Sequence, residues 1–87
     1  MAENNILEEG LKELHKARMG EKALLETHIN EIKVLGMLRK YADESLDEIE
    51  NTMVLNVLFV EVVEATIKAL DKAIGELELI AEEEAEA

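Results

Sequence analysis

Two pairs of ionisable side chains have a spacing that places both members on one face of a helix. His28 precedes Glu31 by three residues, and Glu61 precedes Glu64 by three. Carboxylates that point inward from facing helices are the ligands of di-iron and di-manganese sites in helical bundles. Glu61 interrupts an apolar run. A carboxylate in such surroundings has three alternatives: it binds a cation, it loses free energy by desolvation, or it lies at the edge of the apolar contact and reaches water. These four residues are therefore candidate metal ligands.

The separation of these residues resembles that of the encapsulated ferritins, which are short two-helix members of the ferritin-like group. In that family a Glu on the first helix is followed thirty residues later by Glu-x-x-His on the second. Glu31 and Glu61 have this separation, and Glu64 stands where the family has histidine. The resemblance covers residues 28–70. It implies a bundle that binds iron or manganese and completes a ferroxidase site only when two hairpins dimerise.

The same residues also have structural explanations that need no cofactor, and we favour these. Glu64 precedes Lys68 by four residues, the favourable order for an ion pair on a helix, and Glu61 can reach solvent. His28 on an apolar stripe is typical of a hydrogen-bonded core or rim histidine. Asn56 is typical of a polar residue that sets register, by pairing with its symmetry mate or with the partner helix.

The composition narrows the classes of fold and function. The chain of 87 residues has no cysteine, so disulfides and thiolate metal sites are excluded, and no proline, which favours long helices over a sheet. It has no glycine-rich phosphate loop, no nucleophile elbow and no basic or aromatic surface for nucleic acid. We therefore expect a protein that is not an enzyme.

The net charge of −12 comes entirely from the second half of the chain. Residues 1–42 have seven acids and seven bases, whereas residues 43–87 have fourteen acids and two bases. This acidity repels phosphate, so we expect no nucleic-acid partner and consider another helical or basic protein as an alternative partner. The longest apolar run is too short to span a membrane, and the first residues lack the features of a signal peptide. We expect no membrane partner and a cytoplasmic location.

A seam of apolar residues, spaced alternately by three and four, organises the second half of the chain. Such spacing marks the a and d positions of a coiled coil. The seam consists of Leu46, Ile49, Met53, Asn56, Val60, Val63, Ile67, Leu70, Ile74, Leu77 and Ala81. The first half continues the spacing through Leu7, Leu11, Leu14, Arg18, Glu21, Leu25, His28, Ile32, Leu35, Arg39 and Ala42. Arg18 and Glu21, three residues apart, are expected to pair with each other.

These patterns predict an all-α, antiparallel two-helix hairpin, forming a single domain over residues 1–87. We expect helices at about residues 4–42 and 46–83, with a kink or break near Gly20 as an alternative to one continuous first helix. Ser45 and Glu48 have the spacing of a capping box at the start of the second helix. Residues 82–87 form an acidic tail that we expect to fray, because acids destabilise a helix C-terminus.

The second helix also has an apolar face on the side away from the seam. Its residues are Leu55, Leu58, Val62, Ala65 and Ala69. A two-helix hairpin can cover only one of the two faces, so the other must contact another molecule. We predict a homodimer that forms a four-helix bundle through these five residues, and a self-association or protein-interaction role.

Overall fold

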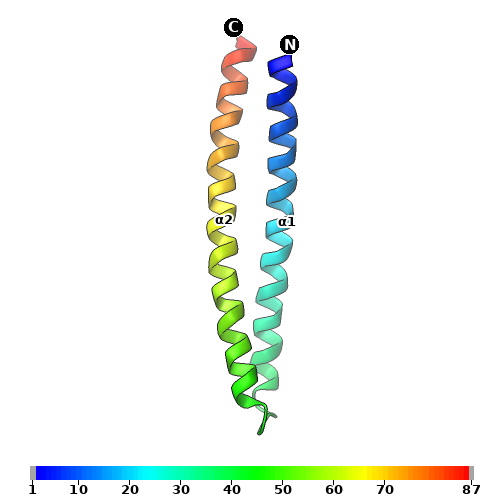
Figure 1. The fold of residues 1–87 in the computed structure, drawn as a ribbon, viewed down its shortest axis with the longest axis vertical. Helices are drawn as coiled ribbons and strands as arrows, with labels where there is room; N and C mark the ends of the chain where they lie inside the picture. Colours follow the sequence, from blue (N-terminus) through cyan, green and yellow to red (C-terminus); the bar gives the residue numbers. More distant parts are fainter. Residues whose placement is uncertain (1, 87) are drawn as a thin grey trace.

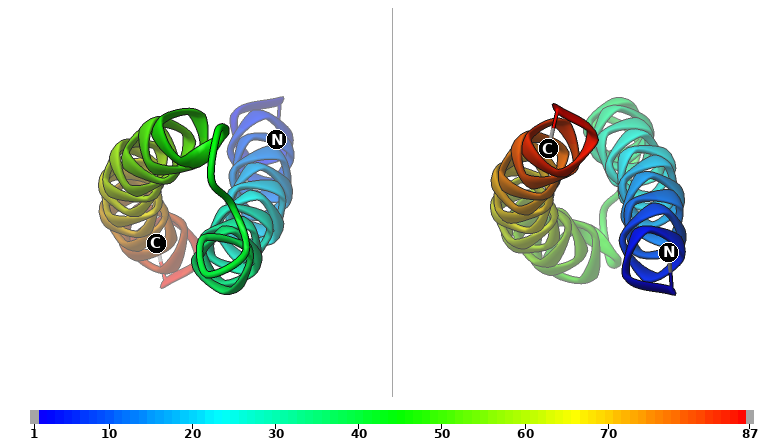
Figure 2. Two further views of the ribbon diagram at one scale, coloured as in Figure 1. Left: turned by 90° about the horizontal axis from the view of Figure 1, so that it is seen from below. Right: turned by 90° about the horizontal axis from the view of Figure 1, so that it is seen from above.

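The computed structural model describes the backbone of residues 2–86 and the side chains of residues 5–86, and it shows two long antiparallel helices (Figure 1). Helix α1 runs over Ala2–Leu38 and helix α2 over Leu46–Glu86. The helices lie side by side in a molecule that measures 66 × 15 × 14 Å, and they wind around each other when seen end on (Figure 2). The predicted all-α, two-helix fold is confirmed over the described residues.

The connection between the helices is longer than predicted, because α1 ends at Leu38 and not at residue 42. The Tyr41 N–H donates to the Leu38 carbonyl at 2.9 Å, a three-residue turn that tightens the end of the helix. At the start of α2, the Ser45 carbonyl accepts a hydrogen bond from the Ile49 N–H at 3.0 Å. This is the backbone bond expected of an N-cap residue. The predicted start of α2 is therefore confirmed.

Both helices continue through the positions where we considered interruptions. Helix α1 is helical on both sides of Gly20, so the chain has one continuous first helix and no break there. Helix α2 continues through residues 82–86, and Ala87 lies outside the described residues. The fraying of the acidic tail stays a prediction. In the part of the chain that the structure describes, no helix has the length and apolar character needed to cross a membrane.

The contact between the helices is the predicted seam. All eleven seam positions of α2 are buried or half-buried, and so are the nine seam positions of α1 from Leu7 to Leu35. Of the described residues, three are buried: Asn56, Val63 and Ile74 have 4%, 5% and 5% of their surface exposed. The interior of the single hairpin is therefore small.

Candidate interaction surface

A polar contact joins the helices across the seam. His28 on α1 donates its Nδ1–H to Oδ1 of Asn56 on α2, at 2.7 Å. The Asn56 Nδ2 group donates to the Thr52 carbonyl at 3.0 Å, which fixes the orientation of the amide. Because Oδ1 can only accept, Nδ1 of His28 carries the proton. Of the two partners considered for Asn56, a symmetry mate and the partner helix, the structure shows the partner helix, and the bond sets the level at which the two helices meet.

Phe59 of α2 packs against the His28 side chain of this hydrogen bond. Its ring stacks on His28 with the ring centroids 5.1 Å apart and the planes at 19°. Half of Phe59 remains exposed. The sequence interpretation missed this residue. Its position directly before the seam residue Val60, and three residues after Asn56, is the signal that could have found it.

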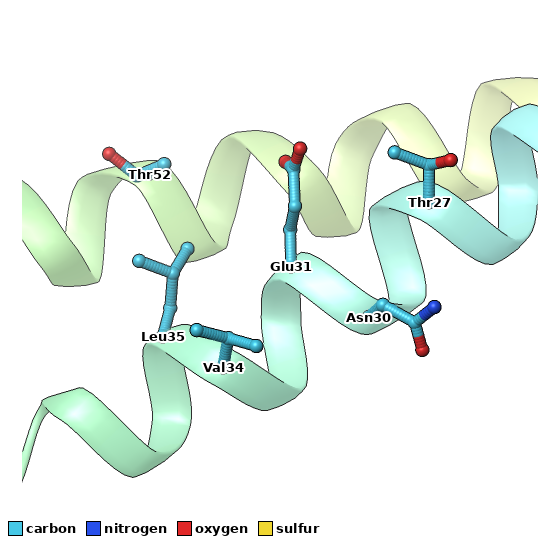
Figure 3. A pocket seen from close by; sticks show the side chains of 6 residues that line it. All are labelled: Thr27, Asn30, Glu31, Val34, Leu35 and Thr52. Carbon is cyan, nitrogen blue, oxygen red and sulfur yellow. The ribbon is translucent and has the colours of Figure 1, made fainter.

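Glu31 lies next to this cluster in an open groove of about 470 Å³. Glu31, Thr27 and Leu35 of α1 point toward α2, from which Thr52 closes the far wall of the groove (Figure 3). Asn30 also lines the groove but points away from α2. The walls are therefore mainly methyl and methylene groups, and Glu31 is the charged group among them.

The structure does not bring the four candidate metal ligands together in one chain. Glu64 lines a different depression, with Lys22 and Asp71, and not the groove of Glu31. Glu61 is exposed, three residues earlier on α2. Among the described residues, no three His, Asp or Glu side chains form a group that could hold a metal ion. The metal site stays a prediction that would need side chains from a second chain.

Among the described side chains, ion pairs link the helices along one side of the seam only. They are Arg18–Asp71, and Arg39–Glu50 at 3.7 Å; on the same side, the His15 imidazole lies 3.8 Å from the Glu78 carboxylate. The expected pairing of Arg18 with Glu21 is wrong, because the Arg18 guanidinium reaches across to the other helix. These pairs are largely exposed, so each contributes at most about 1 kcal/mol to stability.

The acids of these pairs belong to one row of α2 with a seven-residue spacing. We call the side of the molecule along this row the ion-pair side; the row is Glu50, Val57, Glu64, Asp71 and Glu78. The rows on the other side of the seam contain Phe59, Thr52 and Glu31. In a coiled coil these two sets of rows flank the seam on opposite sides.

We call the opposite side the apolar side. Its central residues on α1 are Ala17, Gly20, Leu24, Thr27, Glu31, Val34 and Leu38, and on α2 they are Thr52, Leu55, Phe59, Val62, Thr66, Ala69 and Ala73. Glu31 is the one charged residue of this set. The chain thus separates its charge by side, although the sequence of each helix mixes both kinds of residue.

The predicted interface on α2 is open to solvent in the single chain. Leu55, Leu58 and Val62 have 54%, 51% and 63% of their surface exposed, and Ala65 and Ala69 are also exposed. Large apolar side chains so exposed in one stretch are typical of an interaction site. These side chains therefore form an exposed apolar stretch that α1 does not cover.

The chain has no match among known proteins that would indicate its function. No family model matches it, and neither a curated protein nor a solved structure is significantly similar.

Proposed function

We propose that this chain is a non-enzymatic self-association module, and that two copies combine their helices into a four-helix bundle. The observation that carries the proposal is the contrast between three buried residues among the described side chains and a stretch of large apolar side chains that stay half-exposed on α2. A second copy would cover this stretch and would supply the missing interior for both chains.

The free energy available from this stretch supports a dimer but requires a larger interface. Complete burial of a Leu or Val side chain contributes about 1.5–3 kcal/mol. Leu55, Leu58 and Val62 are about half-exposed, so covering the three in both copies contributes roughly 5–9 kcal/mol. Association costs about 4–15 kcal/mol in lost translational and rotational freedom. A stable dimer therefore needs contacts beyond these residues.

The test is the molar mass of the wild-type chain and of Leu58→Glu, measured by light scattering across micromolar concentrations. We expect the wild type at twice the chain mass of 9.8 kDa. The variant is expected to raise the Kd of the dimer at least about tenfold, because it places a carboxylate in an apolar contact.

Leu79→Glu is the matched control. Leu79 has the same helical position as Leu58 and similar exposure, 57% against 51%, but lies beyond the predicted interface. This variant should keep the dimer. A wild-type chain that is monomeric at micromolar concentration and still unfolds cooperatively would overturn the proposal, since its apolar stretch would then need no cover.

A further inference from the structure

We propose that the second copy docks on the apolar side of the hairpin, so that α1 forms the interface together with α2. This inference rests on the proposed self-association and names the surface that carries it. It differs from an interface made by α2 alone, because it places Leu24 and Glu31 of α1 in contact with the other chain.

The charge distribution decides which side a second copy can approach. The two copies are identical and each has a net charge of −12. On the ion-pair side, a second copy would have to cover both the acids of the flanking row of α2 and the cations that pair with them, and removing several charges from water costs free energy. On the apolar side, Glu31 is the one central charge. A second copy therefore meets the smaller desolvation cost on the apolar side.

The threonine hydroxyls on the apolar side are already hydrogen-bonded within each helix. The chain has three threonines, and all three lie on this side. The hydroxyls of Thr27, Thr52 and Thr66 donate to the carbonyls four residues earlier, at 3.1, 2.7 and 3.0 Å. A hydroxyl bonded in this way can be covered by a second chain without losing a partner. Covering the three threonines with a second chain therefore costs little free energy of desolvation.

The dimensions of this side fit a stable dimer. The whole long face, with its apolar centre and charged ends together, measures 66 × 15 Å and has a projected area of about 990 Å², and stable interfaces bury about 800 Å² on each partner. Apart from Glu31, charged residues occupy the same rows only toward the ends, at Glu3, Glu13, Glu48, Glu76 and Glu83. An apolar centre with charges at the rim is the usual anatomy of a protein interface.

Two substitutions on α1 test the docking side. Leu24, on the apolar side, and Met19, on the ion-pair side, are both exposed, at 44% and 72%. Leu24→Glu is expected to raise the Kd of the dimer about tenfold to a hundredfold, because it removes an apolar contact and adds a buried charge in each copy. Met19→Glu adds the same charge to the same helix and should leave the Kd within about twofold. Sedimentation equilibrium measures both.

The outcomes separate this inference from the proposed function. If Leu24→Glu and Met19→Glu keep the same Kd while Leu58→Glu dissociates the dimer, the docking side is wrong and self-association stands. If the wild type is monomeric, both fail. Circular dichroism of each variant, measured at low concentration, confirms that the helices still form. A larger loss of association for Met19→Glu than for Leu24→Glu would place the second copy on the ion-pair side and overturn the inference.

Discussion

At the scale of single residues, Glu31 is the least favourable group on the surface proposed for docking. Its carboxylate lies in a groove with Thr27 and Thr52, and it is the one charge in the centre of the apolar side. A second chain that covers the groove removes water from this carboxylate, which costs free energy unless a partner compensates it. Glu31 therefore opposes the association that its neighbours favour.

Replacement of this charge should strengthen the dimer. We expect Glu31→Gln to lower the Kd about threefold to tenfold, because the amide is neutral and costs less to bury. Glu26→Gln is the matched control, since it removes the same charge from the ion-pair side of α1 and should change the Kd less than twofold. Sedimentation equilibrium at pH 7 compares the two. Weaker association of Glu31→Gln would show that the carboxylate has a favourable partner, for example a cation held between two copies.

At the scale of the helices, the His28–Asn56 hydrogen bond aligns α1 with α2. The remaining seam consists mostly of aliphatic residues, which pack almost equally well when one helix shifts by a heptad. The hydrogen bond is possible at one level only, because it needs the imidazole of α1 opposite the amide of α2. The stacked ring of Phe59 holds the imidazole in place. The contact thus favours this alignment over one shifted by a heptad.

A double-mutant cycle tests this alignment. Asn56→Leu and His28→Leu each leave the other polar group inside the seam without its partner, so each is expected to lower the free energy of unfolding by about 1–3 kcal/mol. The double variant should recover most of this loss, because no unpaired group remains. Urea unfolding followed by circular dichroism, at one fixed chain concentration, gives the values. Additive losses in the double variant would show that the two side chains act independently.

At the scale of the whole molecule, shape and charge have opposite effects on association. A hairpin of 66 × 15 × 14 Å has a small interior and is therefore of low stability as a single chain, which favours association with a second copy. The net charge of −12 on each chain repels that copy at long range. The segregation of acids to the ion-pair side and to the helix ends reduces this repulsion at the docking surface, but does not remove it.

Salt should therefore strengthen the dimer. Between 50 mM and 500 mM sodium chloride the repulsion between the two acidic chains becomes screened, and we expect the Kd to fall by about threefold or more. Sedimentation equilibrium at a series of salt concentrations measures this trend. A Kd that rises with salt would indicate that attractive ion pairs between the chains dominate the interface, which contradicts docking on the apolar side.

The sequence by itself determined the two helices, the start of the second one and every residue of α2 along the seam. These features follow from spacing within one helix and from local capping, which depend on neighbours three or four residues away. The tertiary structure decided the contacts between the helices. Arg18 pairs with Asp71, Phe59 stacks on His28, and Glu31 lies apart from Glu64. Such contacts depend on the relative level and rotation of two helices, and the apolar period of each helix leaves both undefined.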